Sequence, residues 1–190
     1  MNETVLEILT EETSMAYFLE GLLPRILPGD YCLGVNCFVR PHEGKSHLKK
    51  SLPKKIGAYS RFPYPVKLII VHDQDSGDCL LLKNQLVNLC EFNSNIQFKV
   101  RIVCRELENW YFGDIQAIRK VYPEINSRKL AGKTKADKID SFHGAYELER
   151  MTKSFSKTYA AREIAQIISI DSNHSPSYNQ FLKGLRQLIQ

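Results

Sequence analysis

The chain has 190 residues, of which 43% are hydrophobic and 10% aromatic, which is enough apolar material for the core of one compact domain. This composition excludes a disordered, collagen-like or low-complexity chain, and no apolar run reaches the roughly 20 residues that span a bilayer. The formal net charge of +5 is compatible with a polyanionic partner but does not require one.

Strand-like and helix-like patterns alternate over the first two thirds of the chain. In chain order they predict strand 3–9, helix 15–26, strand 31–39, helix 45–59 with Pro53 as a candidate break, strand 66–71, helix 79–92, strand 98–104, and helices 110–122, 136–151, 157–168 and 178–189. This order predicts an α/β fold: a mostly parallel sheet of about four strands flanked by helices, with further helices in the C-terminal third. No linker or repeat divides residues 1–190, so we expect a single domain.

Acidic residues follow three of the four predicted strands. They are Glu11 and Glu12, Asp73 and Asp75, and Glu106 and Glu108. The carboxyl ends of parallel strands share one edge of a sheet, which is where open α/β folds bind ligands. Residues two apart in an extended chain point the same way, so each of the later pairs is expected to converge on one point.

Crowded carboxylates repel one another unless a cation neutralises them. Oxygen ligands without a cluster of Cys or His favour magnesium or manganese over zinc, and such an ion polarises a phosphate and activates water. The alternative interpretation is structural: Asp75, Asp78 and Glu108 cap or start helices, where carboxylates suit the helix dipole. Spacing alone leaves both interpretations open.

Basic residues are concentrated between His42 and Arg61, where Glu43 is the single acid. They are Lys45, Lys49, Lys50, Lys54, Lys55 and Arg61, and a second basic group is Arg128, Lys129, Lys133, Lys135 and Lys138. Such patches attract phosphate backbones with little sequence preference, although a solvated helix face is the alternative for either group. Lys45 follows the second strand and so opens on the acidic edge, where it is expected to hold the scissile phosphate.

Other motifs have more ordinary interpretations. The chain has no P-loop and no Ser-His-Asp or Cys-His arrangement. His72 is expected to be buried support and Trp110 to lie in the core. Tyr178, Phe181 and Leu185 either form an apolar docking patch on the last helix or cover the sheet.

Several short motifs together resemble a bacterial family known as domain of unknown function 4276, over almost the whole chain. They are LTEETS at 9–14, FLEGLLP at 18–24, HEGK at 42–45, DQDSGDC at 73–79, RELENWY at 105–111 and NHSPS at 173–177. This family is similar to the TOPRIM (topoisomerase–primase) fold, whose relatives include nucleases of the overcoming-lysogenization-defect type. The resemblance implies that Glu11 is the strand-end glutamate and that Asp73 and Asp75 are the DxD pair that binds magnesium.

The resemblance further implies that Glu106 and Glu108 form the ELE motif of the family. Glu12 stands where a glycine is commoner, so Glu11 and Glu12 are both candidates for the catalytic glutamate. Family members often sit beside a gene for an ABC-like ATPase and are associated with defence against phage. These implications concern the fold, the metal and a partner protein.

The sequence and the resemblance together predict a nuclease that depends on Mg²⁺ or Mn²⁺ and cleaves DNA or RNA. Its expected catalytic residues are Glu11, Asp73, Asp75 and Lys45, its metal ligands Glu11, Asp73, Asp75, Glu106 and Glu108, and its nucleic-acid surface Lys45, Lys49, Lys50, Lys54, Lys55 and Arg61. The alternative is a non-catalytic regulatory or sensor subunit of a partner ATPase. Residues 1–4 lack a signal-peptide pattern, so we expect a cytoplasmic protein without a membrane partner, either alone or as a homo-oligomer.

Overall fold

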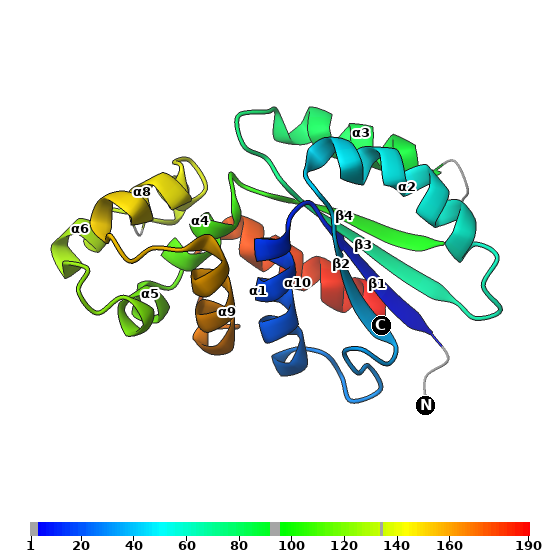
Figure 1. Ribbon diagram of the computed structural model, residues 1–190, viewed down its shortest axis with the longest axis horizontal. Helices are drawn as coiled ribbons and strands as arrows, with labels where there is room; N and C mark the ends of the chain where they lie inside the picture. Colours follow the sequence, from blue (N-terminus) through cyan, green and yellow to red (C-terminus); the bar gives the residue numbers. More distant parts are fainter. Residues whose placement is uncertain (1–3, 92–95, 134) are drawn as a thin grey trace.

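The computed structural model describes residues 4–91, 96–133 and 135–190, and is built on a four-stranded parallel sheet (Figure 1). The strands are β1 (Val5–Thr10), β2 (Cys37–Pro41), β3 (Val66–Asp73) and β4 (Gln97–Val103), in the order β2-β1-β3-β4. Ile8 of β1 pairs with Val39 on one side and Ile69 on the other. The carboxyl ends of β1 and β3 therefore lie next to each other, and the predicted parallel α/β fold is confirmed.

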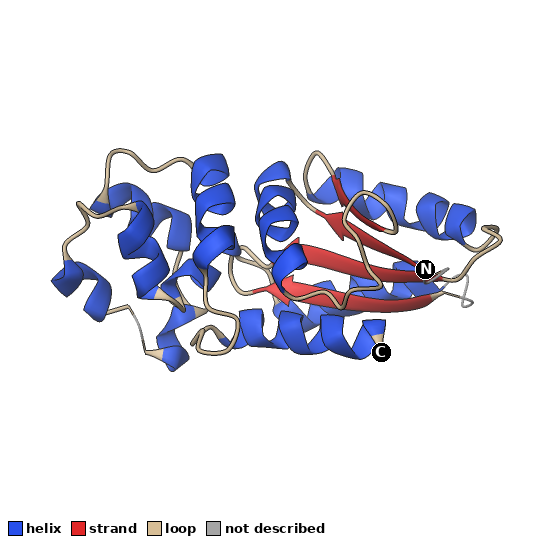
Figure 2. Cartoon of the chain, turned by 90° about the horizontal axis from the view of Figure 1, so that it is seen from below, coloured by secondary structure: helices blue, strands red, loops and turns tan. Residues whose placement is uncertain are grey.

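Helices cover both faces of the sheet because its strands carry apolar side chains on both. Leu6, Ile8, Ile69 and Val71 pack against α1 (Thr13–Leu22) and α10 (Pro176–Ile189). Leu9, Leu68 and Ile70 belong to a second core beneath α2 (Lys45–Tyr59) and α3 (Cys79–Glu91). Figures 1 and 2 show this arrangement, with α2 and α3 on one side of the sheet and α10 on the other.

The remaining helices lie beyond the carboxyl edge of the sheet and form a helical lobe (Figure 1). They are α4 (Leu107–Phe112), α5 (Ile115–Val121), α6 (Ser127–Ala131), α7 (Ala136–Ile139), α8 (Gly144–Met151) and α9 (Lys157–Ile167). The lobe is joined to the sheet layer mainly through α9, which packs against α1. The expectation of one domain over residues 1–190 stays a prediction.

Most predicted elements differ from the structure by a few residues at their ends, and some differ more. The strand predicted at 31–39 begins only at Cys37, because Asn36 closes a turn in which its side chain accepts from the Cys32 N–H at 2.7 Å and donates to the Asp30 carbonyl at 2.8 Å. The helix predicted at 15–26 gives way to the 3₁₀ turn η1 (Leu23–Arg25), since Pro24 has no N–H for the next α-helical bond. The predicted start of the first strand at Glu3 and the predicted end of α3 at Phe92 fall outside the described residues.

The helices predicted at 110–122 and 136–151 are each divided in two, and α6 was not predicted. Asp114 interrupts the first helix by accepting from the N–H groups of Gln116 and Ala117, which starts α5. Loop 140–143 interrupts the second between α7 and α8. Pro53, in contrast, does not break α2, which is continuous from Lys45 to Tyr59.

Of the two alternatives predicted for the last helix, the structure supports the second, in which its apolar residues cover the sheet. Tyr178, Phe181 and Leu185 are buried against the sheet and the core. Trp110, which is fully buried, stacks with the rings of Tyr178 at 5.3 Å and Phe181 at 5.2 Å. Among the described helices, none is both long and apolar enough to cross a membrane.

Candidate functional site

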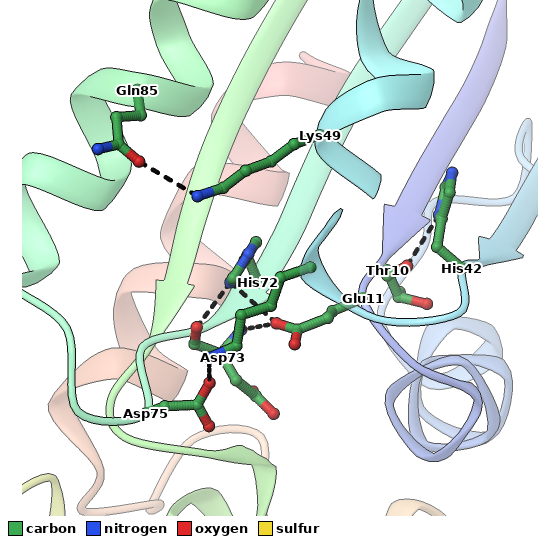
Figure 3. A network of polar contacts seen from close by, with 9 residues as sticks. Thr10, Glu11, His42, Lys49, His72, Asp73, Asp75 and Gln85 are labelled. Carbon is green, nitrogen blue, oxygen red and sulfur yellow. Dashed lines mark hydrogen bonds and ion pairs between the residues drawn. The ribbon is translucent and has the colours of Figure 1, made fainter. Parts of the chain in front are cut away.

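Glu11 and Asp73 lie side by side at the carboxyl edge, as the neighbouring ends of β1 and β3 require. The backbone N–H of Asp73 donates to Glu11 Oε2 at 3.3 Å. The fully buried His72 places Nδ1 2.9 Å from the same Glu11 oxygen and 2.6 Å from the Asp73 carbonyl oxygen (Figure 3). His72 is thus the buried support that was expected, and it orients the glutamate beside the aspartate.

The two candidate glutamates point to different partners. Glu11 faces β3, whereas Glu12 accepts a hydrogen bond from the hydroxyl of Ser14 at 2.5 Å at the start of α1. The geometry therefore favours Glu11 as the residue beside Asp73, with Glu12 contributing negative charge from the next position.

Asp73 is a buried carboxylate at the end of β3. Only 7% of its surface is exposed, and its Oδ1 has no hydrogen-bond partner among the described residues. Burial raises the pKa of Asp73 well above its usual value, and the negative charges of Glu108 and Glu11 raise it further. A cation placed here would relieve both the desolvation of the carboxylate and the repulsion from its neighbours.

Glu108 brings a second buried carboxylate to this region from the first turn of α4. Neither of its carboxyl oxygens has a partner within the described part of the chain, and burial raises its pKa to about 7. The nearby charge of Lys157 opposes this increase. Glu108 does start a helix, as the structural interpretation held, but it makes no capping hydrogen bond.

Lys157, the first residue of α9, is a basic residue of this site that the sequence patterns did not reveal. Burial lowers its pKa, but the charges of Glu108, Glu12, Glu106 and Asp73 together outweigh burial and raise it. In the sequence nothing distinguishes Lys157 from the other lysines. The fold places it at the acidic edge because α9 packs along α1.

Glu106 and Glu108 do not converge, contrary to the expectation from an extended chain. α4 begins at Leu107, so the two side chains leave the backbone in different directions. Glu106 Oε1 accepts from the Ala145 N–H at 3.0 Å and so holds the start of α8. Glu106 thus ties the helical lobe to the edge of the sheet.

Lys45, the first residue of α2, lies at the acidic edge directly after the loop that follows β2. The N–H of Gly44, which has φ of 89°, donates to the Glu11 carbonyl at 2.9 Å, so this loop lies over the end of β1. The ammonium of Lys45 forms an ion pair with Asp75, and this hydrogen bond is the main reason that the pKa of Lys45 is raised. Asp75 is therefore paired in this structure rather than a helix cap, whereas Asp78 does cap α3 by accepting from the Leu81 N–H at 2.8 Å.

The other basic residues of α2 are spread along and around the helix. Lys49 donates to Gln85 of α3 at 3.1 Å (Figure 3). Lys50 and Lys54 are exposed. Lys55 lies on the side of His42: burial lowers the pKa of His42, and the charge of Lys55 lowers it further. Arg61 follows the end of this 15-residue helix, about 22 Å from its start. Arg61 therefore lies at the opposite end of the sheet from the carboxylates.

The acidic edge has the donor chemistry for a hard divalent cation. Three buried carboxylate oxygens, Asp73 Oδ1 and both of Glu108, have no partner in the described structure. No three His, Cys, Asp or Glu side chains within residues 4–91, 96–133 and 135–190 meet closely enough to form a complete ligand set. The residues fit Mg²⁺ or Mn²⁺, ions that bind through a few carboxylates and retain several waters.

Comparison with solved structures places this architecture among known folds. The chain is similar to the C-terminal region of the OLD protein of Xanthomonas campestris pv. campestris, phased with iodine: the TM-score is 0.54 with 15% identity, covering 100% of this chain and 96% of the other. The structure of that region phased with platinum gives a TM-score of 0.53 with 16% identity, covering 98% of this chain and 94% of the other. The structure phased with mercury gives a TM-score of 0.50 with 14% identity, covering 100% of this chain and 97% of the other. The chain thus has the expected TOPRIM-like α/β fold.

The sequence itself identifies the family. The family model Domain of unknown function (DUF4276) matches residues 10–186, so the chain belongs to this family. None of the curated proteins compared with the chain matches it in sequence.

Proposed function

We propose that this protein is a nuclease that hydrolyses phosphodiester bonds of DNA or RNA with Mg²⁺ or Mn²⁺. The observation that carries the proposal is the pairing of Glu11 and Asp73 beside buried carboxylate oxygens without partners. The fold shared with the OLD C-terminal region supports it. A divalent cation, when bound, would neutralise the carboxylates and polarise the phosphate.

The position of each residue at the edge suggests its role in the proposed reaction. Glu11, Asp73 and Asp75 would hold the cation, and Glu108, with Glu106 if released from α8, would be ligands to a second ion. Glu11, held by His72, is also placed to act as general base or acid. Lys45 and Lys157, whose pKa values the carboxylates of the edge raise, would stabilise negative charge on the phosphate.

A cleavage assay tests this function directly. Plasmid DNA and transfer RNA are incubated with the full chain and Mg²⁺ or Mn²⁺, with a chelator as the metal-free arm. Cleavage is expected only with metal and to be weak for the isolated chain until the partner ATPase is added. Glu11→Gln is expected to reduce it about tenfold or more, because glutamine keeps the contact with the Asp73 N–H but loses the charge. Glu43→Gln, at an exposed acid in the loop between β2 and α2, is the matched control. Equal cleavage by wild type and Glu11→Gln would point to a contaminating enzyme and contradict the proposal.

We also propose that α2 binds the phosphate backbone through Lys45, Lys49, Lys50, Lys54 and Lys55, with Arg61 at the far end. Replacing Lys49, Lys50, Lys54 and Lys55 together by glutamine is expected to weaken binding and to reduce the slope of log K against log salt by up to about 3 to 4, because fewer counterions are released. Fluorescence anisotropy with labelled DNA and RNA measures this slope. An unchanged slope would make α2 a solvated helix face.

The biological setting belongs to the same proposal. We infer that the protein is the effector of an anti-phage system and works with an ABC-like ATPase in the cytoplasm. The Lys45–Asp75 ion pair and the incomplete ligand set in the described residues favour a site that a partner must rearrange. The same two observations favour the second candidate, a non-catalytic regulatory or sensor subunit of the ATPase. Metal-dependent cleavage in the presence of the ATPase distinguishes the two.

A further inference from the structure

A cavity of about 350 Å³ lies between the first halves of α2 and α3, beside the carboxylate edge. Its walls combine charge with apolar surface, and its lining includes Lys45, Lys49, His72, Leu81, Leu82 and Gln85. Lys49 reaches across it, donating to Gln85 Oε1 at 3.1 Å (Figure 3). The volume falls within the roughly 300 to 1,000 Å³ of small-molecule sites.

His72 contributes a buried nitrogen, Nε2, that has no hydrogen-bond partner in the described part of the chain. Its Nδ1 faces two acceptors, the Asp73 carbonyl and Glu11 Oε2, and therefore carries the ring hydrogen. In the neutral ring Nε2 is then an acceptor, and it has no partner among the described residues. Because the fully buried His72 lines the cavity, a ligand there that offers a hydroxyl or N–H group would satisfy this atom.

The charges and the apolar wall indicate what else such a ligand carries. Two lysines line the described part of the cavity. Lys45 is paired with Asp75, whereas Lys49 donates to the neutral amide of Gln85, so its charge is not balanced by this contact. Asp78 also lines the cavity, but its carboxylate is tied to the Leu81 N–H at the start of α3. Leu81, at 64% exposure, leaves an apolar surface open in the cavity that Lys49 also lines.

We infer that this cavity receives one nucleotide of the substrate strand, next to the bond that is cut. Lys49 binds its phosphate, Leu81 and Leu82 contact its sugar and base, and His72 Nε2 accepts a hydrogen bond from its nucleoside part. This inference rests on the proposed nuclease function and deepens it. It makes the cavity a subsite that fixes the position of the strand relative to Glu11 and Asp73.

Calorimetric titration of the full chain without metal tests the subsite. The probes are uridine 5′-monophosphate, uridine and inorganic phosphate. The monophosphate is expected to bind at least fivefold more tightly than either fragment. Lys49→Gln is expected to weaken the monophosphate and phosphate about fivefold without affecting uridine, because only the charged contact is lost. Leu81→Ser is expected to weaken the monophosphate and uridine but not phosphate.

Lys183→Gln, at an exposed lysine of α10 on the opposite face of the sheet, is the matched control and should leave all three titrations unchanged. Equal binding of the monophosphate and inorganic phosphate, or equal losses for Lys49→Gln and Lys183→Gln, would overturn the inference. No metal is present and no bond is cut in this experiment. A chain that binds the nucleotide but never cleaves nucleic acid would therefore contradict the nuclease function and leave the subsite intact.

Discussion

Replacing Asp73 by asparagine is expected to abolish cleavage and, at the same time, to stabilise the metal-free protein. Asp73 lies at the centre of the buried acidic edge, so a neutral side chain removes the proposed metal ligand and should lower the rate by about a hundredfold or more. The same change removes a carboxyl group whose pKa is raised by burial and by the charges of Glu108 and Glu11, so that its ionisation destabilises the fold. We expect the free energy of unfolding at pH 7.5 to rise by about 1 to 2 kcal/mol.

The pH dependence of this gain follows from the direction of the pKa shift. A carboxyl group with a raised pKa in the folded state stabilises the fold only while it is protonated, and that stabilisation is lost as the pH rises through the folded pKa. Asparagine does not titrate, so the advantage of Asp73→Asn should be present at pH 7.5 and should disappear near pH 4, where aspartate is protonated or close to it in both states.

Denaturant unfolding at the two pH values, with and without Mn²⁺, measures both effects. Mn²⁺ should raise the free energy of unfolding of the wild type, since a ligand that binds only the folded state stabilises it, and should not raise that of Asp73→Asn. A metal-induced shift of equal size in both proteins would remove Asp73 from the metal site.

The second large effect is expected at Asn109, which joins the acidic edge to the helical lobe. Its side chain is fully buried, donates to the carbonyls of Ile139 at 2.6 Å and Phe142 at 2.8 Å, and accepts from the Glu106 N–H at 3.3 Å. Asn109→Leu keeps the volume but leaves these three backbone groups without their partner. We expect a loss of about 3 to 5 kcal/mol in the free energy of unfolding.

Chemical denaturation followed by circular dichroism measures this loss. Asn88→Leu, at an exposed asparagine of α3, is the control and should change stability by less than about 0.5 kcal/mol. Similar values for the two variants would mean that the lobe does not depend on Asn109.

The sheet and its acidic edge were predictable because they follow from local patterns. The apolar run of β3 can be buried only in a sheet covered on both faces, and a parallel sheet places the residues after β1 and β3 together whatever the loops do. Helix α2 was predicted with its observed bounds, because Leu48, Leu52 and Ile56 recur at helical spacing and face the core.

The parts that were missed depend on side-chain contacts between distant segments. The turn before β2 is closed by Asn36, whose hydrogen bonds compete with strand formation in an apolar stretch. The separation of Glu106 from Glu108 depends on where α4 begins. Lys157 reaches the edge only through the packing of α9 on α1, which no spacing in the sequence records.

The order in which the site residues occur along the chain has a consequence for synthesis on the ribosome. Glu11 is made early, Asp73 and Glu108 follow, and Lys157 comes with α9, after the sheet strands are complete. Strand β1 also cannot take its central place until β2 and β3 have been made to flank it. A nascent chain therefore exposes its acidic residues long before the edge is assembled. Lys157 joins the carboxylates only after α9 has been made, so the edge is assembled late in synthesis.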